Sequence, residues 1–215
     1  DYQLQMMRNN EKIYFKYLTS YFFWFFLVFS FHVSANSVLE ITEDDFVIGD
    51  ENAPVTIIEY ASLSCSHCAD FHLSTLPELM REFVDSGKAK MVFRDFPFNY
   101  PALLGSMVLR CVPEDVRYQY STALYQLQSK WVVRENAKTT SELYKIMQSG
   151  GMSKEEFNQC INDTDMENKL LQGVISAQNE FQIKSTPSFL INGILLEGNK
   201  SIKDFRQIID KILSE

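Results

Sequence analysis

The stretch that decides the fold runs from residue 55 to residue 68 and reads VTIIEYASLSCSHC. Its first part, Val55–Tyr60, is β-branched and almost continuously apolar, which is typical of a buried strand. From Cys68 onward the apolar residues recur at three- and four-residue steps, the pattern of a helix with one buried face: Cys68, Phe71, Leu76, Leu79, Met80 and Phe83. The sequence therefore predicts a strand that leads into a helix, with Ser64 as the N-cap and two cysteines at the junction.

Cys65 and Cys68 have the spacing and the position that redox chemistry requires. Cys65 lies at the start of the predicted helix, where free backbone N–H groups and the helix dipole stabilise a thiolate. His67 lies between the cysteines, and its imidazolium charge or N–H group is expected to favour that thiolate. Cys68, one turn further along, is expected to be buried and to resolve mixed disulfides with Cys65. A lower pKa of Cys65 stabilises the reduced pair and makes the disulfide a stronger oxidant.

The first 35 residues have the features of an export signal. Three basic residues, Arg8, Lys12 and Lys16, precede an apolar run from residue 17 to residue 33, and Val33-Ser34-Ala35 suits cleavage before residue 36. Two alternatives are an uncleaved membrane anchor and a buried core helix. We expect residues 1–35 to be a signal peptide and the rest of the chain to be exported.

Charge limits the classes of partner. The chain has 20 basic and 28 acidic residues, a net charge of −8, and loss of residues 1–35 changes this to about −9. Such a chain lacks the basic patch that binds nucleic acid or anionic lipid. We expect protein or small-molecule partners, no nucleic acid, and a monomer. The remaining length suits one domain, or one domain with a large insertion.

Further strand and helix signals extend the pattern on both sides of the cysteines. Val38–Ile41 is predicted to be a short edge strand, and Met91–Phe93 a second buried strand. Pro77 is expected to kink the helix between the two buried strands, and Gly87 to end it. The strand-helix-strand order predicts a parallel pair with a right-handed crossover.

The middle of the chain, residues 99–181, has helical periodicity throughout. Pro113 is predicted to start one helix and Ser141 another that closes at Gly150, while Ser153 and Glu156 form a capping box for a third.

The end of the chain returns to strand periodicity. Ser188–Ile191 and Ile194–Leu196 flank Asn192-Gly193, which predicts a hairpin with a type I′ turn. The apolar residues of 202–213 fall on one side of a closing helix.

The order βαβ, helical block, ββα predicts an α/β protein with a thioredoxin fold and a large all-helical insertion. From Gly49 to the C-terminus the chain resembles the DsbA-type thiol:disulfide oxidoreductases of the bacterial cell envelope. The matching segments are Ala53–Tyr60, Cys65–His72, Phe93–Pro97 and Thr186–Gly193. We therefore predict a signal peptide (1–35), a first part of a thioredoxin domain (36–98), a helical insertion (99–181) and a second part of that domain (182–215).

The resemblance implies roles for residues outside the C-x-x-C motif. Pro187 matches the cis-proline that faces the two cysteines, and Thr186 would adjust the contact with an extended substrate. Glu59 matches a buried acid that moves the proton of Cys68. From the residues alone, the alternative for Pro187 is an ordinary trans proline that opens an edge strand, and the alternative for Glu59 is a glutamate that faces water. Ser66 stands where the family often has proline, so we do not expect one of the strongest oxidants.

The other two cysteines form a second candidate pair. Four cysteines in an exported chain suggest two disulfides, and the local Cys65–Cys68 pair leaves Cys111 with Cys160. That bridge would stabilise the protein by about 4 kcal/mol in the chain-entropy model. Two separate buried thiols remain the alternative.

The predicted function is transfer of the Cys65–Cys68 disulfide to newly exported, cysteine-containing proteins in the periplasm. The resemblance implies reoxidation by a DsbB-type, quinone-linked membrane protein. No cofactor or metal is expected, because a zinc site built from the two cysteines, His67 and His72 would lack a second C-x-x-C or a paired histidine downstream.

Two other functions stay open. One is a disulfide isomerase or reductase of the same fold, and the other is a redox-silent envelope chaperone that binds peptides in the groove around Pro187. Arg94 and Trp131 are candidate surface determinants near the site, and simple packing is the alternative for both.

Overall fold

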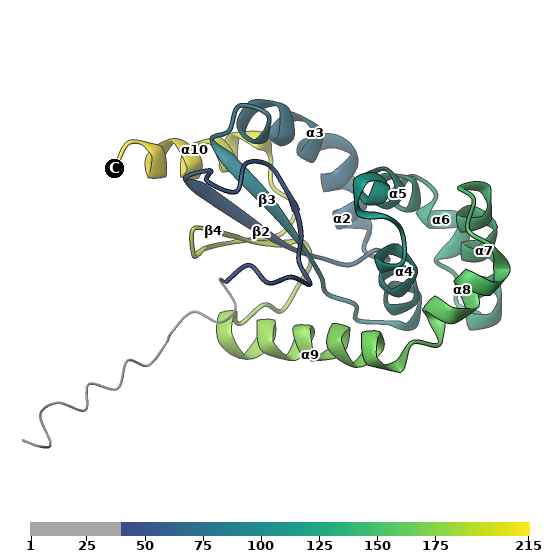
Figure 1. The fold of residues 1–215 in the computed structure, drawn as a ribbon. Helices are drawn as coiled ribbons and strands as arrows, with labels where there is room; N and C mark the ends of the chain where they lie inside the picture. The colour runs from purple at the N-terminus through teal and green to yellow at the C-terminus, as the bar shows by residue number, and fades with distance from the viewer. Residues whose placement is uncertain (1–39) are drawn as a thin grey trace, which may run out of the picture. The chain divides into compact units, whose positions relative to one another are not determined.

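A computed structural model describes residues 40–215, so the predicted signal peptide lies outside the described residues. The centre of this part is a five-stranded sheet with the order β1-β3-β2-β4-β5 (Figure 1). No helix within residues 40–215 has the combination of length and apolarity that crossing a membrane requires. The strands are β1 (Phe46–Ile48), β2 (Val55–Ala61), β3 (Ala89–Asp95), β4 (Ser188–Ile191) and β5 (Ile194–Glu197).

The sheet topology brings three chain segments to one edge. β2 and β3 are parallel, with Ile57 opposite Met91, whereas β4 runs antiparallel to β2, with Tyr60 opposite Ser188. The ends of β2 and β3 and the beginning of β4 therefore meet at the same edge of the sheet. The parallel pair is confirmed, and so is the thioredoxin fold with its helical insertion.

Helices cover both faces of the sheet (Figure 1). Along β2, Ile57 belongs to a core shared with the helix after β2 and with α10 (Ile202–Leu213). Ile58 points to the opposite face, into a core shared with α9 (Thr164–Phe181). Because strand residues alternate between faces, Glu59 lies on the face of Ile57.

The helical block between β3 and β4 forms a third core. This core includes Leu63, Cys68 and Ala69, so the block packs directly on the redox helix. The helices of the block are α4 (Tyr100–Arg110), α5 (Glu114–Gln126), α6 (Gln128–Trp131), α7 (Asn136–Ser149), α8 (Lys154–Ile161) and α9.

Several local predictions are confirmed. Pro113 is the N-cap of α5, and Ser153 forms the predicted capping box with Glu156. Asn192 and Gly193, between β4 and β5, both have positive φ, 45° and 86°, as a type I′ turn requires.

Two predicted boundaries are wrong. The edge strand is Phe46–Ile48 rather than Val38–Ile41: Glu40 and Ile41 lie outside any strand, and residues 38 and 39 lie outside the described part. Phe46 stacks on Phe93 at 5.4 Å between ring centroids, which favours the later segment. Helix α7 begins at Asn136, and Ser141 lies in its interior, where its hydroxyl donates to the Lys138 carbonyl.

The helix after β2 also differs from its prediction. It runs as α2 (Ser66–Asp70), η1 (Phe71–Thr75), α3 (Leu76–Leu79) and η2 (Met80–Val84), where η1 and η2 are π-helical turns. Pro77 lies at the start of α3, just after a π turn, where the hydrogen-bond pattern changes and the missing N–H is tolerated. Gly87, with φ of 73°, follows the helix as expected.

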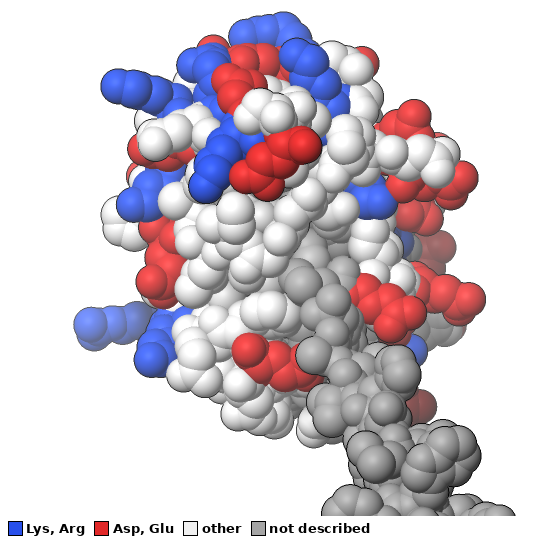
Figure 2. Space-filling model, turned by 90° about the vertical axis from the view of Figure 1, so that its left-hand side faces the viewer, with Lys and Arg blue, Asp and Glu red and all other residues white. Residues whose placement is uncertain are grey.

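Charges of both signs are interspersed on the face of the molecule in Figure 2. They lie along the top and down both sides of this view, around a broad uncharged area. Such mixing does not create the continuous positive potential that attracts a nucleic-acid backbone.

Candidate active site

The two cysteines lie where β2 passes into the redox helix. Cys65, rather than the predicted Ser64, is the N-cap residue, with φ of −86° and ψ of 122°. It is partly buried, whereas Cys68 is fully buried, and both carry free thiols. The backbone N–H of Ser62 donates to Sγ of Cys68 at 3.5 Å, and the Ser62 carbonyl accepts from the backbone N–H of Cys65 at 3.0 Å, so the turn before the helix contacts both ends of the motif.

Thr186 and Pro187 lie directly opposite Cys65. The peptide bond between them is cis, and the protonated thiol of Cys65 donates from Sγ to the Thr186 carbonyl oxygen at 3.3 Å. The antiparallel pairing of β2 with β4 brings together residues that are more than a hundred positions apart. The predicted site residues Cys65, Thr186 and Pro187 thus share one location.

The environment of Cys65 favours its thiolate. A hydrogen bond from the Cys68 thiol is the largest influence that lowers the pKa of Cys65 to about 5. The Thr186 side chain and the backbone N–H groups of Cys68 and His67 lower it further, while partial burial opposes the shift. The helix start therefore supplies donors to Cys65, as expected of a reactive cysteine.

Cys68 has the opposite environment. Burial is the main reason that the pKa of Cys68 is raised, and its hydrogen bond to Cys65 and the nearby Glu59 add to the shift. Two sulfurs one helical turn apart therefore differ in protonation at neutral pH. Cys65 is a thiolate and Cys68 is a thiol.

Glu59 is buried beside Cys68, and its partner is a histidine. Its side chain is fully inaccessible, and the exposed alternative is wrong. Nε2 of His72 lies 3.0 Å from Oε2 and 3.2 Å from Oε1 of Glu59. His72 comes from η1 and is 4% exposed. Within residues 40–215, no group of three histidine, cysteine or acidic side chains is arranged to hold a metal ion.

His67 acts through its backbone in this structure. Its side chain is exposed, and no hydrogen bond or ion pair from the ring is present in the described part of the chain. The backbone N–H of His67, in contrast, points to Cys65.

Gln128, at the start of α6, is a site residue that sequence reasoning missed. Its Nε2 donates to the carbonyls of Leu63 and Cys65 at 2.9 and 3.0 Å. The sequence pattern contains no sign of this contact, because it depends on how the helical block packs against the redox turn.

Comparisons with known proteins agree with this geometry. A family model described as "Thioredoxin" matches residues 41–211. The crystal structure of α-DsbA1 from Wolbachia pipientis superimposes with a TM-score of 0.78 and 30% identity, covering 84% of this chain and 96% of that chain. The chain belongs to the DsbA-like thioredoxin family.

Curated relatives of this DsbA-like chain have related names. A Rickettsia felis protein named "Putative protein-disulfide oxidoreductase" is 31% identical over 82% of this chain and 63% of its own length. "Disulfide bond formation protein D" of Bacillus subtilis is 23% identical over 78% of this chain and 76% of its own length. The chain thus spans just under two thirds of the rickettsial relative.

The helical block of this DsbA-like protein contains a disulfide. Cys111, at the end of α4, is bonded to Cys160 of α8, with Cα atoms 6.2 Å apart. The bridge closes a loop with a sequence separation of 49 residues. It joins two helices that pack in the same core as Cys68.

Two side chains expected on the surface have structural partners instead. Trp131 is fully buried, and its Nε1 donates to the Leu124 carbonyl at 2.9 Å. Arg94 is only 14% exposed and binds the Asp45 carboxylate at 2.7 Å, while its Nη1 donates to the Tyr60 hydroxyl at 3.1 Å. The surface role is therefore wrong for Trp131 and Arg94, and the packing alternative is confirmed for both.

Proposed function

We propose that this DsbA-like chain is a periplasmic dithiol oxidase that transfers its Cys65–Cys68 disulfide to exported proteins. The observation that carries the proposal is the opposite direction of the two pKa shifts, lowered for Cys65 and raised for Cys68. A disulfide whose attacked sulfur later departs as a stable thiolate is readily transferred and favours the reduced state of its owner.

The reaction begins when a substrate thiolate attacks Sγ of Cys65. The Cys65–Cys68 bond breaks, its electron pair goes to Sγ of Cys68, and Glu59 supplies the proton that this high-pKa thiol requires. A second substrate thiolate then attacks the substrate sulfur of the mixed disulfide. The substrate disulfide forms, and Cys65 leaves as a thiolate that needs no proton at neutral pH. Two electrons have passed from the substrate to the cysteine pair.

Thr186 and Pro187 are the proposed substrate-binding residues. The Thr186 carbonyl, 3.3 Å from Sγ of Cys65, is placed to accept an N–H from an extended peptide. Phe98 is 57% exposed. The next residue, Asn99, accepts a hydrogen bond from the Ser64 hydroxyl at 3.0 Å, which keeps this apolar side chain close to the redox turn. The substrate surface thus combines a backbone contact with an apolar contact.

Export and reoxidation complete the proposal. The predicted signal peptide would direct the chain to the periplasm, and a DsbB-type quinone-linked membrane protein would accept electrons from the reduced pair. Both elements rest on the sequence pattern and on the family.

The deciding experiment is the reduction potential of the Cys65–Cys68 pair, measured against glutathione with Cys111 and Cys160 intact. Compared with a pair whose first cysteine has the ordinary thiol pKa, a Cys65 pKa of about 5 raises the reduction potential at neutral pH by at most about 60 mV. The increase is smaller where solvent screens the partly exposed sulfur. We expect a potential between about −200 and −120 mV. A value near the −270 mV typical of thioredoxin would make the protein a reductase.

A Cys65→Ser variant separates the oxidase from the chaperone. Oxidation of a reduced, unfolded substrate protein should be lost completely in this variant, because no disulfide can form at the attacked position. A chaperone would instead be identified by two results together: the wild-type protein does not oxidise the substrate, and Cys65→Ser suppresses substrate aggregation as well as the wild type does.

A further inference from the structure

Glu59 must exchange protons with the solvent, yet it is fully inaccessible, and so is Cys68. Each transfer of the disulfide gives a proton to Cys68, and each reoxidation removes one. His72 contacts the Glu59 carboxylate through its Nε2, which lies 3.0 Å from Oε2 and 3.2 Å from Oε1. His72 is therefore the first group through which a proton can pass between Glu59 and the outside.

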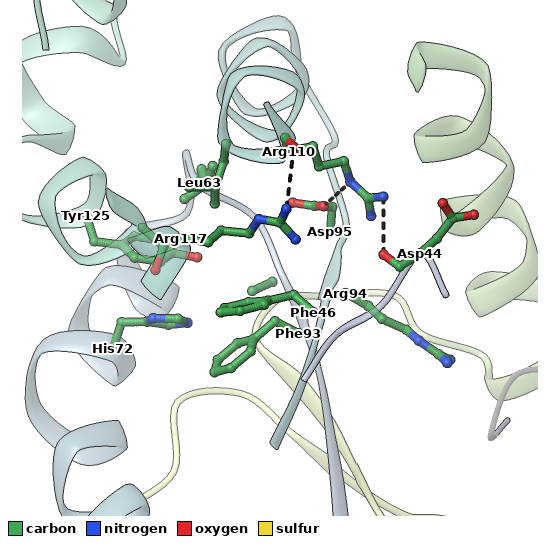
Figure 3. A pocket seen from close by; sticks show the side chains of 13 residues that line it. Asp44, Phe46, Leu63, His72, Phe93, Arg94, Asp95, Arg110, Arg117 and Tyr125 are labelled. Atoms are coloured by element: carbon green, nitrogen blue, oxygen red, sulfur yellow. Dashed lines mark hydrogen bonds and ion pairs between the residues drawn. The ribbon is translucent and has the colours of Figure 1, made fainter. Parts of the chain in front are cut away.

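The second nitrogen of His72 has no partner among residues 40–215. Nδ1 is buried and makes no hydrogen bond within residues 40–215. The ring points into a pocket with a volume of about 50 Å³, where it faces the rings of Tyr125 and Phe93, at 4.4 and 5.8 Å between centroids (Figure 3). An imidazole that donates from Nε2 has a free acceptor at Nδ1.

The pocket leads from His72 to the surface. Asp44, at its other end, has a side chain that is 62% exposed. A second buried atom that lacks a hydrogen-bond partner in the described part of the chain, Nε of Arg117, belongs to the same pocket. A space of this size exceeds the roughly 15 Å³ that one water needs. Much of the lining is apolar, but Nδ1 of His72, Nε of Arg117 and the other charged side chains in the wall offer the partners that water requires. The pocket is thus suited to a short chain of water molecules.

We propose that His72 and this pocket form the path by which Glu59 exchanges protons with the solvent, which makes His72 a positioning and relay residue. The inference rests on the proposed thiol–disulfide exchange. During substrate oxidation Glu59 gives a proton to Cys68, Nε2 of His72 gives one to Glu59, and Nδ1 takes one from water. During reoxidation each step reverses, so the ring returns to its first tautomer once per cycle.

The groups around His72 come from every element packed on it. Glu59 belongs to β2, Tyr125 to α5 and Cys68 to α2, and Cys68 faces the same buried carboxylate. The remaining charged groups line the pocket further from the ring: Arg94, Asp95, Arg110, Arg117 and Asp44. Arg94 and Arg110 already pair with Asp45 and Asp95, at 2.7 and 2.9 Å.

The test measures how fast Cys68 resolves a mixed disulfide. Reduced protein is mixed with excess oxidised glutathione, which forms a Cys65–glutathione disulfide, and acid quenching with mass spectrometry follows its decay. Here Cys68 loses its proton to Glu59, attacks Sγ of Cys65 and expels glutathione as a thiolate. In His72→Gln the amide keeps a donor for Glu59 but cannot relay a proton. We expect the decay to slow by about 10-fold or more, within the range of general acid–base effects.

Two controls distinguish a relay from a structural role. The pKa of Cys65 and the free energy of unfolding should stay unchanged in His72→Gln, because the hydrogen bond to Glu59 is kept. In the double variant His72→Gln with Glu59→Gln, the mixed disulfide should decay no more slowly than in Glu59→Gln alone, because losses at two steps of one proton path do not add. Wild-type decay in His72→Gln, or additive slowing in the double variant, would overturn the proposal.

A second variant covers the case in which His72→Gln does not fold. Ser121→Val enlarges a buried side chain in the pocket wall and leaves the Glu59–His72 pair intact. Slowed decay supports the path, and unchanged decay overturns it. The result is separate from the oxidase proposal, because resolution by Cys68 occurs in a reductase as well. A low reduction potential with slowed decay rejects only the oxidase, and a high potential with wild-type decay rejects only the relay.

Discussion

Gln128 and Cys65 are joined by a hydrogen bond from the side-chain amide of Gln128 to the backbone carbonyl of Cys65, at 3.0 Å. The same nitrogen donates to the Leu63 carbonyl at 2.9 Å. One side chain of the helical block therefore holds both sides of the turn that presents the reactive sulfur.

Replacement of Gln128 by alanine should loosen this turn. Each hydrogen bond contributes about 0.5–1.5 kcal/mol net, so we expect Gln128→Ala to lower the free energy of unfolding by about 1–2 kcal/mol in urea titrations. Gln126→Ala is the matched control, because Gln126 is exposed on the neighbouring helix. Equal stability of the two variants would show that the amide bonds contribute nothing.

The thiolate of Cys65 should appear at low pH. Ultraviolet absorbance of the reduced protein is expected to titrate with a midpoint of about 5. Cys68→Ala should raise this pKa, because it removes the hydrogen bond with the largest influence, whereas Cys68→Ser keeps a donor and should raise it less. A midpoint above 8 in the wild type would contradict the assignment of Cys65 as the attacked sulfur.

The same shift predicts how stability depends on pH. The pKa of Cys65 is lowered on folding, so its contribution to the reduced protein is complete above the ordinary thiol pKa and is lost as pH falls through about 5. Between these limits the stability difference between reduced wild type and Cys65→Ala should grow by up to about 1.4 kcal/mol per pH unit, less the effect of solvent screening. A difference that shrinks with rising pH would have the wrong sign.

Two helical glycines should respond oppositely to alanine. A Cβ at Gly105 would lie 2.9 Å from Cη2 of Trp131 and 3.1 Å from Cδ1 of Leu63, both buried. We expect Gly105→Ala to destabilise by about 1–3 kcal/mol, despite the better helix propensity of alanine. At Gly173 nothing lies within 4 Å, so Gly173→Ala should stabilise by about 0.5–1 kcal/mol. Thermal unfolding of both variants checks the contrast.

The Cys111–Cys160 disulfide should stabilise the helical block without supporting the chemistry directly. Removal of the bridge by Cys111→Ser with Cys160→Ser should cost up to about 4 kcal/mol, because it closes a loop of 49 residues. The pKa of Cys65 should not change, since neither cysteine contributes to its shift. A large change in that pKa would show that the bridge adjusts the site itself.

The sequence predicted the elements whose signals are local. The apolar run of β2, the helix that follows Cys65 and the Asn192-Gly193 turn each carry their own periodicity or turn chemistry. The fold class followed from the order of these elements. The position of Glu59 on the buried face also follows from alternation along the strand, once the strand is known to be covered on both sides.

The remaining features depend on packing between distant segments. The Glu59–His72 pair joins a strand to a helix, and Gln128 reaches the redox turn from another helix, so neither contact has a signature within one window of sequence. The same limit applies to Trp131: the sequence does not separate a surface role from packing, and the third core encloses this side chain. The start of α7 was misplaced because Ser141, a good cap residue, also tolerates the interior of a helix when its hydroxyl bonds a preceding carbonyl.

The order of strands has a consequence for how this protein can vary. The helical block leaves the sheet after β3 and returns before β4, at the edge where Cys65 and Pro187 lie, while the hairpin between β4 and β5 and the connection before β2 lie at the other end. Changes in the length or composition of the block can therefore leave the strand register untouched and still reshape the surroundings of the reactive sulfur. Homologous blocks grafted in place of residues 100–181, which leaves Thr186 and Pro187 in the chain, should alter substrate choice while the sheet folds as before.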